Sequence, residues 1–308
     1  MKSDTFFINA KGKDLYARKW LPDEGTPNAV VLIIHGMIEH SGRYSRFAEA
    51  LTKQGFAAYA YDHRGHGKTD ADRLGIIDSD DSFHQMTDDL NTVRKEIQGK
   101  HPDLPLYFFA HSMGSFLTQR YMQLYENSPD GIIYSGSNGK PPILLYVGLL
   151  IANIIGEMKG KTYRSKMIHN LTFGPFNAMF KPNRTDNDWL SRDENEVDKY
   201  VDDPQCGFVP AVEFYSDFFS GLMKLHSHKP FAGRHPETPI LIISGDQDPV
   251  SYMGDGIKKL QKHFEESGVA DLKVNLYKGA RHELLNETNR DEVTADVIYW
   301  LKEKMESV

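Results

Sequence analysis

The chain contains the stretch Leu106-Tyr107-Phe108-Phe109-Ala110-His111-Ser112-Met113-Gly114-Ser115. Its first four residues form an apolar run that is typical of a buried strand in a parallel sheet. Helical periodicity follows over Ser115–Tyr125, so the chain changes from strand to helix within a few residues. A turn this sharp requires small residues two positions before and after its central residue, and Ala110 and Gly114 flank Ser112 in this way. The stretch therefore predicts a serine at a strand-to-helix turn, with the positive end of the helix dipole directed at it.

Short apolar runs bounded by turn residues recur along the chain, with helical patterns between them. We expect buried strands at Val30–Ile34, Phe56–Tyr61, Leu106–Phe109, Ile132–Tyr134, Ile240–Ile243 and Val274–Tyr277. We expect helices at Tyr44–Lys53, Phe83–Ile97, Ser115–Tyr125, Gly256–Glu266 and Glu292–Lys304. This alternation predicts an α/β fold, in which one mostly parallel sheet carries helices on both faces. The opening residues, Met1–Trp20, alternate polar and apolar side chains around Lys11-Gly12-Lys13, which predicts a β-hairpin and not a signal peptide.

The alternation of strand and helix stops after Gly139 and resumes only at Pro239. No strand pattern is present as far as about Gly207. This segment contains, in order, an apolar helix candidate at Ile143–Ile155, a second candidate near Tyr163–Leu171 and a polar acidic stretch, Asp186–Asp203. We interpret it as a helical cap above the sheet. The predicted organisation is a first part of the core at residues 1–138, the cap at 139–207 and the second part of the core at 208–308.

The composition limits the partners and the location of the protein. Its 308 residues include 36 Lys and Arg against 43 Asp and Glu, a net charge of −7. A mildly acidic chain offers no overall attraction to nucleic acid or to anionic lipid. Cys206 is the only cysteine, which excludes an intramolecular disulfide and fits a reducing cytoplasm, the expected location. The most apolar stretch, Ile143–Ile155, is shorter than the roughly 20 residues of a membrane span, so we expect a soluble protein.

Two residues late in the chain are candidates to activate the serine. A serine hydroxyl becomes a strong nucleophile when a neighbouring base takes its proton. His282 follows the last expected strand and Asp248 the strand before it, so both are expected at the carboxyl edge of the sheet, where open α/β sheets build their sites. The order Ser112, Asp248, His282 is the order in which a sheet with this kind of turn presents a catalytic triad. Asp246 is the alternative acid, but Asp248 lies further into the loop and is better placed to reach His282.

Two other motifs carry candidate residues that we set aside. Ser137 lies in Ser135-Gly136-Ser137-Asn138-Gly139, which has the same pattern of small residues as the first turn. The prolines of Lys140-Pro141-Pro142 disfavour a helix directly after Ser137, so this stretch predicts a loop that follows a strand. His63 and His66 suggest a metal pair, but they lie in a Gly-rich loop with no cysteine nearby. We favour a tight turn with hydrogen-bonded imidazoles there, and we expect neither a metal nor a cofactor.

The loop His35-Gly36-Met37 directly follows the strand Val30–Ile34. In a sheet of this type, the loop after an early strand supplies a backbone N–H group that faces the nucleophile. The expected donors to an oxyanion are the N–H groups of Met37 and of Met113, the residue after Ser112. Each such donor lowers the barrier by about 3 kcal/mol. The methionine side chains are then free to line an apolar pocket.

The stretch His35-Gly36-Met37-Ile38-Glu39-His40-Ser41-Gly42-Arg43-Tyr44 resembles a signature of the monoacylglycerol lipase and lysophospholipase branch of the α/β-hydrolases. Further stretches that resemble motifs of this branch are Asp62-His63-Arg64-Gly65-His66-Gly67, His111-Ser112-Met113-Gly114, Trp189-Leu190-Ser191-Arg192, Asp202-Asp203-Pro204, Asp248-Pro249-Val250 and His282-Glu283. The resemblance spans nearly the whole chain, and it implies the α/β-hydrolase fold, a small-molecule ester as substrate and no cofactor. Ala110 stands where the family has glycine, and the cap between Gly139 and Trp189 matches no family motif.

These residues predict a serine ester hydrolase in which Ser112 is the nucleophile, His282 the general base and Asp248 the acid that orients it. We expect a lipid-like monoester as substrate, a monoacylglycerol or a lysophospholipid. The apolar cap helix, Pro142–Ile155, is suited to line an acyl channel or to make a transient contact with a membrane surface. An aminopeptidase is the alternative enzyme, with the acidic stretch Asp193–Asp203 as the candidate to hold a substrate amine. For this stretch we favour a solvent-exposed helix face. The sequence is also compatible with a short-chain carboxylesterase and with a binding protein that lacks catalytic activity, and it leaves the oligomeric state open.

Overall fold

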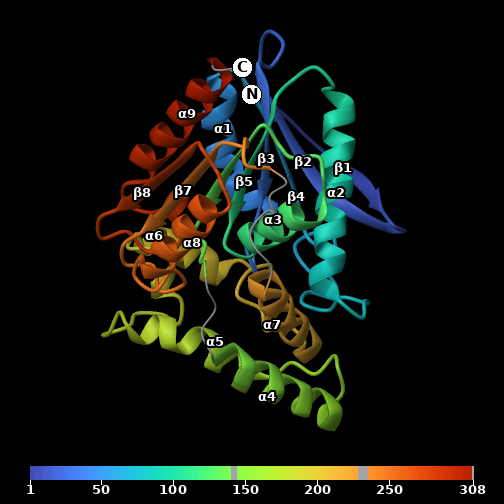
Figure 1. Ribbon diagram of the computed structural model, residues 1–308. Coiled ribbons are helices and arrows are strands. Elements are labelled where there is room, and N and C mark those ends of the chain that lie inside the picture. Colours follow the sequence, from blue (N-terminus) through green and yellow to red (C-terminus); the bar gives the residue numbers. More distant parts are fainter. Residues whose placement is uncertain (140–143, 228–234, 307–308) are drawn as a thin grey trace.

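The computed structural model describes residues 1–139, 144–227 and 235–306. In these residues one sheet contains the strands β1 (Lys2–Ala10), β2 (Lys13–Leu21), β3 (Ala29–Ile34), β4 (Phe56–Tyr61), β5 (Leu106–His111), β6 (Gly131–Ser135), β7 (Ile240–Gly245) and β8 (Leu272–Tyr277). The strand order is β1-β2-β4-β3-β5-β6-β7-β8 (Figure 1). β2 is antiparallel to both β1 and β4, and all other neighbouring strands are parallel. The predicted hairpin and the mostly parallel sheet are confirmed.

The α-helices of the described chain are α1 (Ser45–Lys53), α2 (Ser82–Lys100), α3 (Met113–Leu124), α4 (Leu144–Lys159), α5 (Lys166–Ala178), α6 (Glu194–Asp202), α7 (Val212–Ser227), α8 (Asp255–Glu266) and α9 (Arg290–Glu306). Side chains of α2, α3 and α8 belong to the apolar core on one face of the sheet. Side chains of α1 and α9 belong to the core on the other face. The prediction of helices on both faces is therefore confirmed.

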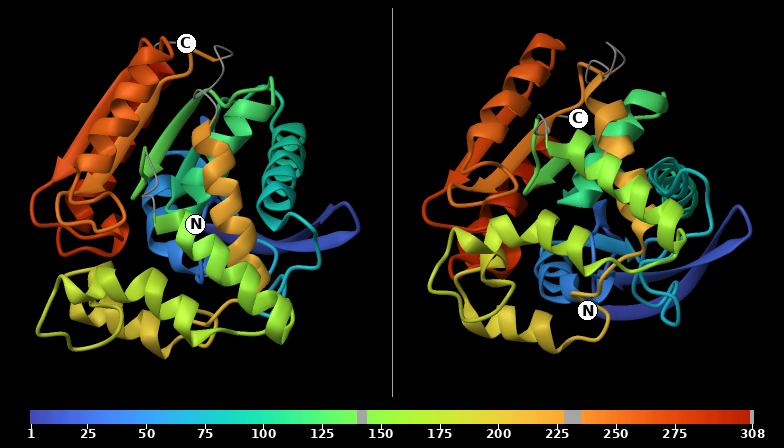
Figure 2. Two further views of the ribbon diagram at one scale, coloured as in Figure 1. Left: turned by 60° about the horizontal axis from the view of Figure 1, so that its bottom comes forward. Right: turned by 90° about the horizontal axis from the view of Figure 1, so that it is seen from below.

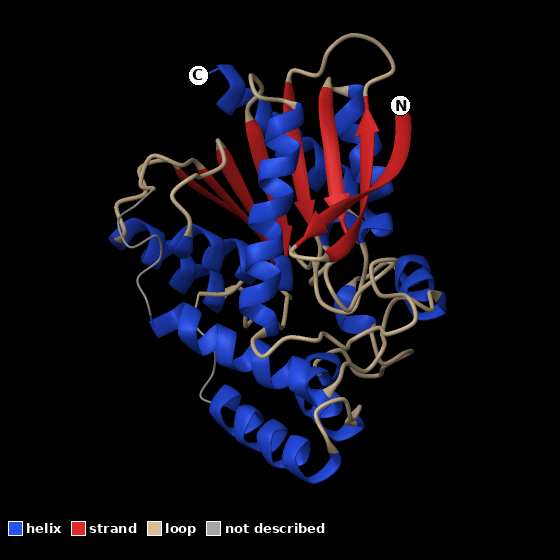
Figure 3. Cartoon of the chain, turned by 90° about the vertical axis from the view of Figure 1, so that its right-hand side faces the viewer, coloured by secondary structure: helices blue, strands red, loops and turns tan. Residues whose placement is uncertain are grey.

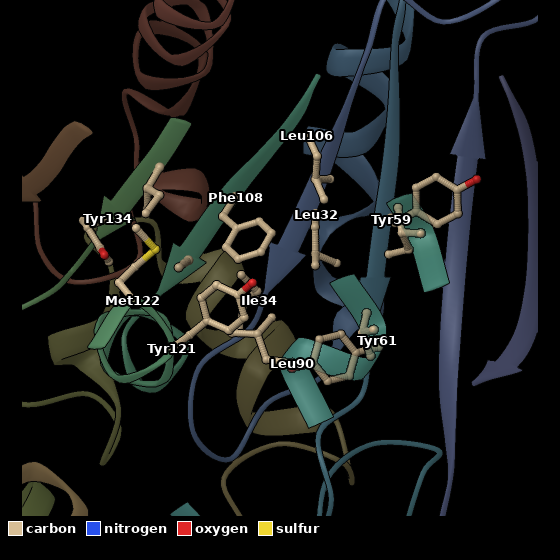
Figure 4. Close-up of a cluster of buried hydrophobic side chains, with 14 of the residues drawn as sticks. Leu32, Ile34, Tyr59, Tyr61, Leu90, Leu106, Phe108, Tyr121, Met122 and Tyr134 are labelled. Carbon is tan, nitrogen blue, oxygen red and sulfur yellow. The ribbon is translucent and has the colours of Figure 1, made fainter. Parts of the chain in front are cut away.

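The core on the α2 and α3 side shows why the strands read as unbroken apolar runs. Leu32 and Ile34 of β3 and Phe108 of β5 belong to one buried cluster with Leu90 of α2 and Tyr121 of α3 (Figure 4). Successive strand residues point to opposite faces of a sheet. Because helices cover both faces here, each strand residue must be apolar whichever way it points.

The cap lies beyond the carboxyl edge of the sheet, at the end of the molecule opposite the two termini (Figures 1 and 2). It contains α4, α5, the short 3-10 helix η2 (Asp188–Leu190) and α6. α4 packs against α7, which also contacts α2 and α3, and Figure 3 shows the cap helices below the twisted sheet. The predicted apolar helix is present from Leu144 onward, while Ile143 and Lys140-Pro141-Pro142 lie outside the described residues. The limits of the cap at residues 139 and 207 stay a prediction.

One helix, α7, was not among those predicted, whereas the solvent-exposed helix face expected in the acidic stretch is present as α6. α6 lies within the acidic stretch Asp186–Asp203, and it begins where the carboxylate of Asp193 accepts a hydrogen bond from the N–H of Asn195 at 3.1 Å. α7 carries apolar side chains at helical spacing that fill the space under the cap: Phe214, Phe218, Leu222 and Leu225. Within the described ranges, no helix has both the length and the apolar character needed to cross a bilayer.

Candidate active site

Ser112 lies at the turn between β5 and α3, where its backbone has φ 50° and ψ −118°. Residues with a side chain rarely adopt a positive φ, and here it aims the serine out of the path of both strand and helix. Gly114 makes the turn possible, because a methyl group at this position would lie 2.3 Å from the carbonyl oxygen of Ile34 and 2.7 Å from that of His35. The requirement for a small residue comes from this close approach of α3 to β3.

The side chains of His282 and Asp248 meet at the same edge of the sheet. Nδ1 of His282 lies 3.0 Å from each carboxylate oxygen of Asp248, and both residues are buried. The N–H of Val250 donates to Oδ1 of Asp248 at 2.9 Å, which fixes the carboxylate from a second side. The alternative acid, Asp246, accepts a hydrogen bond from the N–H of Gly279 at 2.7 Å and so supports the loop that carries His282.

Two rings lie against His282, with centroids 4.7 Å away for His111 and 5.1 Å away for Trp189. Burial lowers the pKa of His282, but the charge of Asp248 and the hydrogen bond to it raise the pKa more, so the net value lies above that usual for histidine. Burial, together with the neighbouring His282, lowers the pKa of His111 to about 4. Of these two imidazoles, only His282 is therefore suited to take and release protons near neutral pH.

Ser112 and His282 line one cavity. The cap covers it with two aromatic side chains, Phe173 of α5 and Trp189 of η2, whose rings are stacked with centroids 5.9 Å apart. The backbone carbonyl of Leu190 also accepts a hydrogen bond at 2.8 Å from the residue that follows His282. The cap is therefore in direct contact with the histidine loop and forms part of the wall of the cavity that Ser112 lines.

The loop after β3 passes beside the serine, because a methyl group at Gly36 would lie 3.2 Å from Cβ of Ser112. Met37 of this loop lines the same cavity, and Met113 is the first residue of α3. Within the described residues, neither the N–H of Met37 nor that of Met113 donates a hydrogen bond to another protein group. Two unused N–H donors near one hydroxyl suit a negative charge that develops on oxygen.

A network of buried charges that was not predicted from the sequence joins these loops. Arg43 donates to both carboxylate oxygens of Glu283 at 2.6 Å and to Glu39 at 2.7 Å. Glu39 also accepts a hydrogen bond from the N–H of Gly36 at 2.6 Å. The network therefore connects the loop after β3 to the residue beside His282. The signal was present in the quoted motifs, since Glu39 and Arg43 lie in the first of them and Glu283 in the last.

Ser137, the alternative serine, is completely buried. Its hydroxyl oxygen accepts hydrogen bonds from Oγ of Ser115 at 2.8 Å and from Nε2 of Gln119 at 3.0 Å. Both partners belong to α3, and Ser137 is not among the residues that line the cavity with Ser112. Ser137 lies in the loop after β6, and its hydrogen bonds hold this loop against α3.

His63 and His66 lie in a buried turn, as the Gly-rich loop predicts. Nε2 of His63 donates to the carbonyl of His35 at 3.1 Å, and Nδ1 of His66 donates to the carbonyl of Arg64 at 2.8 Å. Burial, together with the neighbouring imidazole of His66, lowers the pKa of His63 to about 3, and burial also lowers the pKa of His66. Both rings therefore pack as neutral groups beneath the loop after β3.

The described residues bring three types of metal ligand together at one place, where ligand atoms of His40, Asp203 and Cys206 lie within 4.8 Å of one another. Nε2 of His40 is 2.9 Å from Asp203, and its Nδ1 accepts a hydrogen bond from the N–H of Gly42 at 3.1 Å. Both ring nitrogens of His40 thus already have partners within the protein. The contact between His40 and Asp203 links the end of the cap to the core.

Known proteins resemble the chain over most of its length. Residues 25–289 match the family model described as Serine aminopeptidase, S33. Rat monoglyceride lipase is 27% identical over 297 residues, which cover 95% of this chain and 86% of the rat protein. The monoacylglycerol lipase of Mycolicibacterium smegmatis is 27% identical over 97% of both chains.

Solved structures extend this similarity to the fold. A highly thermostable carboxyl esterase from Bacillus coagulans, in complex with glycerol, superposes with a TM-score of 0.87 at 27% identity over 99% of each chain. A soluble variant of monoglyceride lipase from Saccharomyces cerevisiae, in complex with a substrate analog, shares the fold with a TM-score of 0.74 at 21% identity, over 99% of this chain and 95% of the yeast one. The chain therefore belongs to the serine aminopeptidase S33 family and is an ester hydrolase of the α/β-hydrolase fold.

Proposed function

We propose that the protein cleaves lipid-like carboxylic monoesters, of the monoacylglycerol or lysophospholipid type, through an acyl-enzyme on Ser112. The observation that carries this proposal is the pair of Asp248 and His282, joined at 3.0 Å beside the cavity that His282 shares with Ser112. A buried carboxylate that orients a histidine, next to a serine on a strained turn, is the arrangement that acyl transfer requires.

The proposed reaction has two steps. First, His282 takes the proton of Ser112 Oγ while this oxygen attacks the ester carbonyl carbon, and the N–H groups of Met37 and Met113 bind the resulting oxyanion. His282 then passes the proton to the leaving alcohol oxygen as the C–O bond breaks, which leaves the acyl group on Ser112. Water repeats the sequence, with its proton taken by His282, and releases the acid. Asp248 holds the imidazole in the tautomer that accepts the proton at Nε2.

The lipid-like substrate is supported by the names of the relatives and by the surroundings of the site. Rat and mycobacterial proteins of similar sequence are named monoglyceride or monoacylglycerol lipases. The cavity has an aromatic roof, Phe173 and Trp189, which suits an apolar acyl chain. The outer face of α4 is also apolar, so we propose that the cap makes a transient contact with the lipid surface that contains the substrate.

The test is ester hydrolysis by Ser112→Ala, with Ser137→Ala as the matched control. We expect Ser112→Ala to lose a factor of about 10⁴ or more in kcat and Ser137→Ala to retain most activity. An acyl-chain series then tests the substrate, with C8 to C16 monoesters expected to react faster than acetate esters. Faster turnover of acetate esters would favour a short-chain carboxylesterase, and full activity of Ser112→Ala would remove the proposed mechanism.

An aminopeptidase is the second candidate, because the matching family is described as a serine aminopeptidase. This activity needs a carboxylate near the cavity to hold a free substrate amine. Of the acidic stretch proposed for this purpose, Asp193 instead pairs with Arg290 at 2.6 Å and Glu196 with Arg46 at 2.9 Å. Hydrolysis of aminoacyl amides at a rate above that of long-chain monoesters would favour the peptidase. Inertness toward both substrates and toward an organophosphate would favour a binding protein.

A further inference from the structure

We propose that Glu287 is a positioning residue for the reaction at Ser112, because it joins the histidine loop, residues 279–287, to the cap segment 188–192. This inference rests on the proposed function, since it assigns a residue that aims the proposed general base, His282. Glu287 is not among the described residues that line the cavity of Ser112. It therefore acts through the histidine loop and not by contact with the substrate.

The carboxylate of Glu287 is completely buried and accepts hydrogen bonds from the histidine loop and from the cap. Its Oε1 accepts from the N–H of Arg281, the residue directly before His282, at 2.8 Å. The same oxygen accepts from the N–H of Arg192 at 3.1 Å, and Oε2 accepts from Nε of Arg192 at 2.8 Å. A buried carboxylate is costly unless it is paired and hydrogen-bonded, so these contacts hold the loop and the cap together.

The residues on both sides of His282 also bond to backbone carbonyl groups of the cap segment. Nη1 of Arg281 donates to the carbonyl of Asp188 and, at 3.1 Å, to that of Ser191. The N–H of the residue after His282 donates to the carbonyl of Leu190 at 2.8 Å. Because the cap holds the chain before and after His282, the direction of the imidazole depends on the cap as well as on the core.

The guanidinium group of Arg192 reaches both ends of the histidine loop. A methyl group at Gly279, where the loop begins, would lie 2.9 Å from Nη1 of Arg192. Nη2 of the same side chain donates to Oδ1 of Asn289, just past the end of the loop, at 2.9 Å. Loss of this guanidinium would leave Glu287 buried without the cation that pairs with it, and the loop would lose a contact at each end.

The proposed reaction requires that His282 keep Nδ1 on Asp248 while its Nε2 turns to Ser112. Ser112 and Asp248 follow the core strands β5 and β7, whereas the chain on both sides of His282 is bound to the cap. A displacement of about 1 Å between reacting groups can lower a rate about 100-fold. The pair of Glu287 and Arg192 therefore aligns one member of the proposed triad with the other two.

The test is the kinetics of Glu287→Gln and Arg192→Gln with a soluble ester, at a temperature below the unfolding transition of each variant. We expect kcat to fall by about 30- to 100-fold while KM stays within about threefold, because the base is misplaced and the cavity is not changed. Reaction of Ser112 with a fluorophosphonate should slow by the same factor. Arg192→Lys keeps a cation beside Glu287 and is expected to recover at least about tenfold of the loss in kcat.

The matched control is Arg184→Gln, because the side chain of Arg184 is 39% exposed against 32% for Arg192 and its partners, Asp198 and Glu194, lie in the cap. Its kcat is expected to stay normal. Normal kcat in Arg192→Gln, an equal loss in Arg184→Gln, or a change confined to KM or to the unfolding temperature would overturn the proposal. The Arg192 variants decide it even where Glu287→Gln does not fold, since Arg192 is partly exposed. Absence of a Ser112 adduct in the unmodified protein would instead contradict the proposed function.

Discussion

Ser112 occupies a backbone conformation that costs of order 1–3 kcal/mol for a residue with a side chain. The surrounding contacts maintain it, because Ser112 N–H donates to the carbonyl of Ser135 at 2.9 Å and its own carbonyl accepts from Ser115. The strain places the hydroxyl at the edge of the cavity that His282 also lines. The backbone strain at Ser112 therefore lowers the stability of the fold slightly, and in return Ser112 and His282 line the same cavity.

The roles proposed for the two neighbouring acids, Asp248 and Asp246, differ and can be separated by isosteric changes. Asp248→Asn is expected to lower kcat by up to about 10⁴, because the amide no longer selects the tautomer of His282 that accepts a proton at Nε2. Asp246→Asn keeps an oxygen that accepts the hydrogen bond of Gly279, so its kcat is expected to stay within about tenfold of normal. Steady-state kinetics with a soluble ester measures both. Equal losses in the two variants would contradict the assignment of Asp248.

If His282 is the general base, as proposed, the pH dependence of the reaction reports on its protonation. The general base must be neutral, and the charge of Asp248 raises the pKa of His282 above its usual value in spite of burial. The value of kcat/KM is therefore expected to rise with pH along a limb whose midpoint lies above about 6.5. A profile of kcat/KM from acid to neutral pH tests this. A midpoint well below about 6.5 would mean that His282 is not held by a charged Asp248.

The site residues differed in how far the sequence predicted them. Ser112, Asp248 and His282 follow strands whose apolar runs are clear, so their common edge could be inferred from the sheet alone. The pairing of Arg43 with Glu283 could not be inferred, because Glu283 lies 240 positions away and no local pattern links the two residues. A buried arginine requires an acid, but only the folded chain shows which one.

At the scale of elements, the site depends on the close approach of α3 to β3. Gly114 lies at this contact, with the carbonyl groups of Ile34 and His35 next to its Cα. The loop after β3 then continues to Gly36 and Met37 beside Ser112. The spacing of one helix and one strand therefore sets the distance between the serine and the expected oxyanion donors.

A single added methyl group is expected to disturb this contact. Gly114→Ala should lower the free energy of unfolding by about 3 kcal/mol, because the methyl group would meet backbone atoms that cannot move aside. Gly99→Ala is the control, since nothing lies within 4 Å of a methyl group there and alanine favours the helix α2. Chemical denaturation of both variants measures the difference. Equal stabilities would show that α3 can move away from β3 at little cost.

Elements were predicted well where burial on both faces enforced an apolar pattern. β4 spans the predicted residues, whereas β5 continues to His111 because Ala110 and His111 pair with Tyr134 and Ser135 of β6. α6 was expected only as a solvent-exposed helix face without defined bounds, because its outer side is acidic and only a few of its side chains are buried. Its helical structure depends on contacts with the core, which a local pattern does not contain.

At the scale of the whole molecule, several histidines are buried as neutral groups. Burial is the main cause that lowers the pKa of His111 to about 4 and that of His63 to about 3. The unfolded chain, in contrast, binds protons at these positions near a pH of about 6.5. Between these values the unfolded state holds more protons than the folded state, so acid favours unfolding.

The free energy of unfolding is therefore expected to fall as the pH drops from about 6.5 toward about 5. Each of these histidines contributes a slope of up to about 1.4 kcal/mol per pH unit once the unfolded state is protonated. His282 does not add to this loss, because its raised pKa keeps it protonated in the folded state as well. Denaturant titrations at several pH values measure the effect. Stability that is constant or rises as the pH falls over this range would contradict the neutral burial of His63 and His111.

The proposed activity depends on one nucleophile at the meeting point of core and cap. Reaction with a fluorophosphonate, followed by peptide mapping of the modified protein, tests this most directly. We predict one adduct, on Ser112, and loss of ester hydrolysis in proportion to labelling. An adduct on Ser137 or on any other residue, with Ser112 unmodified and hydrolysis abolished, would contradict the central claim that Ser112 is the nucleophile.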